Sequence, residues 1–173
     1  GTHCFTQAMY DEVETELSNV TSNLITMFDA MYPGDYRLVG DTSYQLYKGE
    51  QNLTHDYTLI DRIKQDTELE VSLFYQDTRV LTTITENSGS RIIGSGAPSI
   101  VLTDVFSSGE CHFYNKTMIY GKSYFSYYAP LFNRDGTVVG MFAVCKPSDA
   151  VDASVQASVR PLFIADILFM LMA

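Results

Sequence analysis

Apolar residues in the first part of the chain recur at spacings of three and four, the period of one face of an α-helix. The stripe consists of Phe5, Met9, Val13, Leu17, Val20, Leu24, Met27 and Met31. Acidic residues crowd its early turns, and Pro33-Gly34 follows as a stop signal. The pattern predicts one long N-terminal helix within residues 1–35. Its apolar stripe is narrow, which fits either packing on its own domain or pairing with a partner chain.

Beyond residue 35 the pattern changes to the alternation that is typical of half-buried strands. The clearest example is residues 70–86, where two alternating runs fold back at Gln76-Asp77. Three more strands are expected further on (residues 111–119, 122–132 and 137–146). A strand with an internal turn and two short helices complete the pattern (residues 44–53, 56–68 and 98–106). Because successive strands join through hairpins, the sheet is predicted to be mainly antiparallel and the fold class α+β.

The C-terminal part is expected to form a helix that starts at a Ser148 cap and becomes almost wholly apolar from Leu162. Residues 162–173 are too few to span a bilayer, which needs about 20 apolar residues. The favoured interpretation is the truncated start of a transmembrane helix, and the alternative is an ordinary packed helix. The predicted organisation is therefore a long helix (1–35), a folded core (36–147) and an exit helix (148–173).

The composition indicates a folded domain, because 46% of the 173 residues are apolar and only 18% are charged. The net charge is −10 and no basic run occurs, so nucleic acid is excluded as a partner. Cys4, Cys111 and Cys145 are too few and too scattered for a disulfide framework. Cys111 and His112 are neighbours on a predicted strand and point to opposite faces, which argues against a shared metal. No metal or cofactor is expected.

Motifs of enzymatic chemistry do not occur in the sequence. It contains no Walker loop, dinucleotide fingerprint or nucleophile elbow, and Gly94-Ser95-Gly96 is only a fragment of a glycine-rich loop. Three histidines and dispersed acidic residues suggest no nucleophile–base pair. We therefore expect no catalytic residues and no enzyme activity.

Several segments, taken in their order, resemble a single Cache domain, the extracytoplasmic PAS-like sensor of bacterial chemoreceptors and sensor kinases. They are DTRVLTT, GSRIIGSGA, VLTDVFSSGECHF and YYAPLFNRDGTVVGMF. The resemblance covers roughly residues 44–146, and both flanking helices fit the same layout. It implies an antiparallel sheet of about five strands, with the long helix packed behind it and a ligand cavity in front. It also implies a location on the extracytoplasmic side of the cell membrane, with the exit helix leading into a transmembrane segment.

The same resemblance implies a ligand-binding arginine. In the related citrate- and dicarboxylate-sensing kinases, an Arg followed three residues later by a His binds substrate carboxylates; these positions are Arg79 and Thr82 here. Two further basic positions of those kinases correspond to Tyr127 and Ala129. Specificity for di- or tricarboxylates therefore does not carry over. The expected ligand is a small monocarboxylate, an amino acid or a neutral polar molecule.

Strand 122–132 is unusually rich in aromatic rings. Alternation places Tyr124 and Tyr128 on one face and Phe125 and Tyr127 on the other, without indicating which face meets a cavity. The matched position of Tyr127 favours the face that it shares with Phe125. The expected ligand-binding residues are Arg79, Thr82, Thr83, Arg91, Tyr114, Lys122, Tyr124, Phe125 and Tyr127.

Two further expectations concern how these residues come together. A bulge near Asp77 would bring Arg79 and Thr82 to one cavity, and Arg91 would close its top. The alternative for Arg79 is a structural pair with an Asp of the domain.

The functional interpretation is a sensing module of a membrane-anchored bacterial transducer, most simply a chemoreceptor, with histidine kinase and diguanylate cyclase also compatible. The alternatives are an adhesion or protein-contact domain without a small ligand and, less favoured, an extracellular hydrolase. Asp11, Glu12, Glu14 and Glu16 would lie close together in a helix pair. We therefore expect only a weak homodimer of the isolated fragment.

Overall fold

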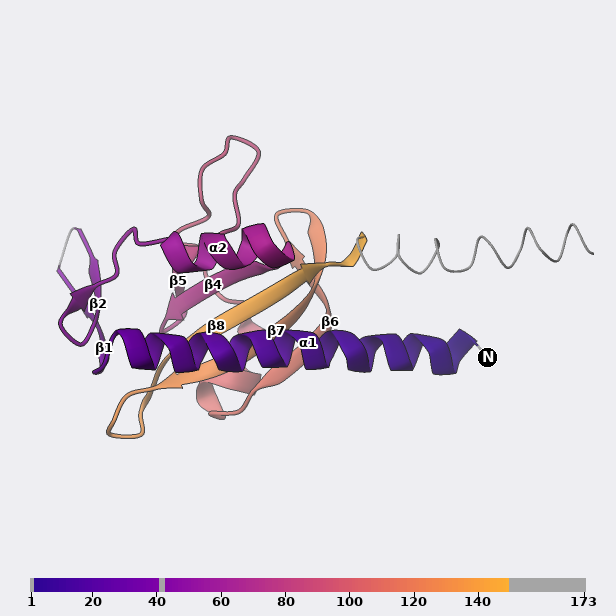
Figure 1. Ribbon diagram of the computed structural model, residues 1–173, viewed down its shortest axis with the longest axis horizontal. Coiled ribbons are helices and arrows are strands. Elements are labelled where there is room, and N and C mark those ends of the chain that lie inside the picture. Colours follow the sequence, from indigo (N-terminus) through magenta and orange to yellow (C-terminus); the bar gives the residue numbers. More distant parts are fainter. Residues whose placement is uncertain (1, 41–42, 150–173) are drawn as a thin grey trace, which may run out of the picture.

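The computed structural model describes residues 2–40 and 43–149 (Figure 1). Its largest sheet has five strands in the order β5-β4-β8-β7-β6, and every neighbouring pair is antiparallel. These strands are β4 (Glu70–Tyr75), β5 (Thr78–Thr82), β6 (His112–Ile119), β7 (Lys122–Phe132) and β8 (Val138–Pro147). The prediction of an α+β fold with a five-stranded antiparallel sheet is confirmed.

Shorter elements surround this sheet. The first three strands form a separate antiparallel meander: β1 (Tyr36–Val39), β2 (Gln45–Lys48) and β3 (Gln51–Asn52). Helix α2 (Thr58–Thr67) follows it, and α3 (Ser99–Val101) continues into the π-helix η1 (Leu102–Ser107). Strand β1 was not expected from the sequence. The meander lies at the opposite end of the molecule from the N-terminus (Figure 1).

Helix α1 (Thr2–Met31) lies along one face of the five-stranded sheet (Figure 1). Leu17 and Leu24 are fully buried, as the apolar stripe requires. Nearer the C-terminal end of α1, the Phe28 ring meets the Phe142 ring of β8 edge-on, with centroids 5.0 Å apart. The predicted packing of the long helix behind the sheet is therefore confirmed.

The opposite face of the sheet, called here the front face, is covered by the connection between β5 and β6. Val101 and Val105, from α3 and η1, pack with Phe74, Tyr128 and Met141 of the sheet, together with Ile84 and Ile92 of the preceding loop. The two faces thus have different covers: one continuous helix behind, and short helical turns and loops in front. Loops and short helical turns offer room for a site that a continuous helix does not.

The end of β8 and the N-terminal end of α1 lie at the same end of the molecule (Figure 1). The predicted exit helix (148–173) lies outside the described part from residue 150 onwards, and so does its apolar segment. Within the described residues, no helix has the length and apolar character needed to cross a membrane.

Candidate functional site

A β-bulge in β5 positions two of the predicted site residues. Leu73 pairs with Leu81 but Phe74 pairs with Arg79, so β5 contains one extra residue at this point. The bulge lets Arg79 and Thr82 meet at one residue of β4: Arg79 Nε donates to Ser72 Oγ at 3.1 Å, and Thr82 Oγ1 lies 2.8 Å from the same oxygen. The bulge thus brings Arg79 and Thr82 together at Ser72, whereas their sharing of one ligand cavity stays a prediction.

Arg79 is a buried cation, with 3% of its surface exposed. Its Nη1 donates to Ser95 Oγ, and the guanidinium lies 4.7 Å from the centroid of the Phe74 ring. Burial lowers the pKa of Arg79. No carboxylate lies within 4.0 Å of its guanidinium nitrogens in the described part of the chain. A buried charge normally has an anionic partner, because leaving water otherwise costs several kcal/mol.

Tyr128 contributes a second unsatisfied group to the front face. The residue is fully buried, its ring packs 6.1 Å from Phe74, and Tyr114 meets it edge-on at 5.8 Å. Its hydroxyl has no hydrogen-bond partner among the described residues. Burial raises the pKa of Tyr128, and the nearby Arg79 partly opposes this shift. A cation without an anion and a hydroxyl without a partner thus lie in one buried region.

Small side chains fill the middle of the sheet between these groups. Cys145 of β8 pairs with Ser126 of β7, whose hydroxyl is 2.5 Å from that of Thr117, and Ala143 of β8 pairs with Tyr128. Burial raises the pKa of the Cys145 thiol to about 12, so the thiol is neutral. No group of three or more His, Cys, Asp or Glu side chains placed to hold a metal occurs in residues 2–40 and 43–149.

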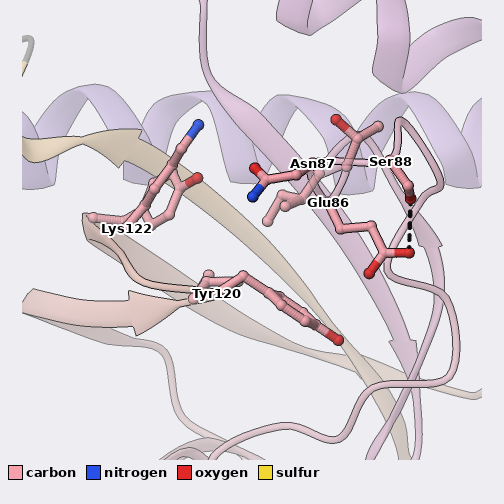
Figure 2. A pocket seen from close by; sticks show the side chains of 9 residues that line it. Glu86, Asn87, Ser88, Tyr120 and Lys122 are labelled. Carbon is pink, nitrogen blue, oxygen red and sulfur yellow. Dashed lines mark hydrogen bonds between the residues drawn. The ribbon is translucent and has the colours of Figure 1, made fainter.

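A cavity of about 340 Å³ opens at the margin of the front face, between the turn after β5 and the β6–β7 hairpin (Figure 2). Ile84, Ile119 and Tyr124 line it and belong to the same apolar cluster as Phe74 and Tyr128. Figure 2 shows Glu86 and Ser88 on one side of the cavity and Tyr120 and Lys122 on the other. Lys122 and Tyr124 are thus predicted site residues that line a cavity, which we call the front cavity.

Arg91 and Thr83 have partners within the fold. Arg91 makes two hydrogen bonds of 2.7 Å to Asp61 of α2, which raise its pKa, and its guanidinium lies 3.7 Å from the centroid of the Tyr57 ring. Thr83 donates to the Glu70 carboxylate at 2.5 Å. These contacts tie the end of β5 to α2 and β4. Arg91 was expected to close the top of a cavity, but its guanidinium instead binds Asp61.

Phe125 and Tyr127 face α1, so the expectation that they share a cavity with Arg79 is wrong. Phe125 packs with Val13 and Leu17, and Tyr127 lies against the same cluster. Strict alternation along this part of β7 leaves Tyr124, Ser126 and Tyr128 on the front face instead. Tyr114, also expected at the site, contacts Tyr128 there and donates its hydroxyl to Asp104 at 2.9 Å.

Sequence analysis missed Ser72, Ser95 and Tyr128 as candidate site residues. Alternation could have identified Tyr128 once Tyr124 was chosen, because the two residues share a face of β7. Ser72 and Ser95 carry no comparable signal. They meet Arg79 only because β4 and the loop after β5 approach it in space.

A five-stranded antiparallel sheet with a long helix behind it and a loop-covered face in front is the architecture of PAS-like sensor domains. The sequence model of the family Single cache domain 3 matches residues 51–158, more than half of the chain. The chain therefore belongs to the single Cache domain family. Cache domains are extracytoplasmic ligand-sensing modules of membrane signal transducers and are not catalytic. Comparison with curated proteins found no match.

Proposed function

We propose that this chain is the sensor domain of a membrane-anchored bacterial signal transducer, a chemotaxis receptor in the first instance, and that it binds a small monoanionic ligand at its front face. The observation that carries the proposal is the buried Arg79 guanidinium, which has hydroxyl partners and no described carboxylate partner. A ligand carboxylate would supply the missing charge.

The chemistry around Arg79 favours one negative charge on the ligand. Ser72 and Ser95 already accept hydrogen bonds from the guanidinium, and the partnerless Tyr128 hydroxyl can donate to a second carboxylate oxygen. Lys122 is exposed and lies at the rim of the front cavity. Among the described residues, Arg79 is therefore the cation that is buried in this region. A monocarboxylate or an amino acid fits this set, whereas a second or third buried carboxylate would lack a partner.

The arrangement of the ends supports a role in transmembrane signalling. The N-terminal end of α1 and the end of β8 lie at one end of the domain, and Lys146 of β8 contacts Glu16 of α1 at 2.7 Å. A change in the sheet on ligand binding can thus be transmitted to both α1 and the end of β8. Coupling to a kinase or a cyclase would use the same geometry.

The test is thermal stabilisation of the domain by acetate, lactate and alanine, with malate and citrate as multivalent comparators. A ligand at one hundred times its dissociation constant adds about 2.7 kcal/mol of stability. Arg79→Ala should abolish this stabilisation. Arg62→Ala should retain it, because the Arg62 side chain is 72% exposed and pairs with Asp66 on the surface of α2.

Arg79→Met preserves most of the aliphatic packing of the side chain. It serves as the test variant if Arg79→Ala does not fold. Retention of full binding by a folded Arg79 variant would exclude this residue from the site. Absence of stabilisation by every small anion would favour the alternative, a ligand-free protein-contact domain.

A further inference from the structure

A second and larger cavity, of about 440 Å³, lies between the β1–β2 meander, the β4–β5 turn and the loop segment at Ile93 and Gly94. Its walls include Leu38, Leu46, Tyr75 and Val80. These four residues belong to or pack against the core beneath α1, not the front-face cluster. We call this space the distal cavity, because the meander lies at the end of the molecule opposite the N-terminus (Figure 1).

The chemistry of the distal cavity is mainly apolar and carries no acidic side chain. Its two threonine hydroxyls have partners: Thr54 Oγ1 accepts from the Leu46 amide at 2.7 Å, and Thr78 donates to Asp77 at 3.0 Å. Arg79 also borders the space, but its guanidinium is bonded to Ser72 and Ser95. The walls therefore suit an uncharged molecule better than an ion.

Exposed apolar side chains surround the distal cavity. Tyr44 is 60% exposed and Ile93 is 43% exposed, although both line a concave space. Large apolar groups that remain in water beside a cavity are typical of a ligand-binding surface. A volume of about 440 Å³ lies within the range of roughly 300–1,000 Å³ that small-molecule sites occupy.

We propose that the distal cavity is a second binding site, for a small uncharged molecule with an aromatic or branched aliphatic body. The site adjoins the one proposed around Arg79 and shares that residue with it, but Ser72, Ser95 and Tyr128 do not line the distal cavity. Gly94 donates its amide to the Arg79 carbonyl at 2.8 Å, and the Arg79 amide donates to the Ser95 carbonyl at 2.9 Å. A molecule in the distal cavity thus contacts the segment that holds Arg79 in place.

Indole is a suitable probe, because the chain has no tryptophan and the emission of indole is free of tryptophan background. Titration of indole with the domain should give a saturable change in emission. Ile93→Arg should weaken indole binding about tenfold or more, since it places a charge on an apolar wall. Ile100→Arg is the matched control, because Ile100 is 60% exposed on α3 and does not line the cavity.

Three further variants make the outcome decisive. Thr78→Tyr should also reduce binding, because it fills part of the cavity from an exposed position and does not depend on the folding of Ile93→Arg. Tyr120→Ala, in the front cavity, should leave indole binding unchanged. Tyr128→Phe should retain it as well, because Tyr128 does not line the distal cavity, and this separates the site from the anion site. Absence of saturable binding, equal effects of Ile93→Arg and Ile100→Arg, or loss with Tyr120→Ala would overturn the proposal.

Discussion

The Lys48 ammonium lies 3.0 Å from an Asp29 carboxylate oxygen, although only 3% of the Lys48 side chain is exposed. The same ammonium donates to the carbonyls of Tyr32 and Gly34, at 2.8 Å each. Both carbonyls follow the end of α1 at Met31, where a helix leaves its last acceptors without intrahelical partners. Lys48 therefore fastens the C-terminal end of α1 to β2 of the meander.

Lys48→Met should destabilise the domain by about 2–3 kcal/mol, because it leaves two carbonyls and one carboxylate without the buried donor. Urea unfolding measures the change. Lys116→Met is the control, since Lys116 is exposed on the edge strand β6 and its loss should change stability by less than about 0.5 kcal/mol. Equal stability of the two variants would show that Lys48 contributes no more than a surface lysine.

Tyr128→Phe should leave the free energy of unfolding of the free domain unchanged or raise it by up to about 1 kcal/mol. The reason is that it removes a buried hydroxyl that has no described partner. The same substitution should weaken ligand binding about tenfold, the usual cost of one hydrogen bond in a buried site. Thermal unfolding with and without ligand measures both effects.

Tyr36→Phe provides the matched control for this prediction. The Tyr36 hydroxyl is the other buried side-chain group without a partner in the described residues, and it lies in the core beneath α1. Tyr36→Phe should share the gain in stability but leave ligand binding unchanged. Equal loss of binding in both variants would show that the Tyr128 hydroxyl does not contact the ligand directly.

Much of the fold was predictable, because it depends on local periodicity. The apolar stripe of α1, the hairpin at Gln76-Asp77 and the alternation in β7 all act over a few residues. The β5 bulge was also anticipated, and it brings Arg79 and Thr82 to Ser72.

The predictions that failed concern positions that tertiary contacts determine. Alternation separates the two faces of β7, but only the docking of α1 decides that Phe125 and Tyr127 lie beneath the helix. Arg91 meets Asp61 across thirty positions of sequence, and no spacing rule indicates such a pair. Strand β1 was missed for a similar reason. The Asn133 side chain exchanges two hydrogen bonds with the Tyr36 backbone, far away along the chain.

Cysteine reactivity should separate the three thiols into two classes. Cys4 and Cys111 are exposed and should react rapidly with Ellman's reagent in the folded domain. Cys145 is 2% exposed and burial raises its pKa to about 12, so little thiolate is available near neutral pH. It should react only after unfolding in urea. Rapid reaction of all three thiols would contradict the packing described for the front face.

Self-association of the isolated domain should be weak and should strengthen with added salt. Asp11, Glu12 and Glu14 are exposed on α1, and a second copy docked along this helix would bring like charges together. Glu16 differs, because it pairs with Lys146 of its own chain at 2.7 Å and contributes less repulsion. Salt screens exposed charges over about 10 Å at 0.1 M, so the dimer should gain affinity as ionic strength rises.

Sedimentation velocity at low and high salt measures this change, and Glu12→Gln should raise the affinity at low salt. A tight dimer that salt does not affect would show that apolar contacts, such as those of the exposed Met27 and Met31, dominate the interface.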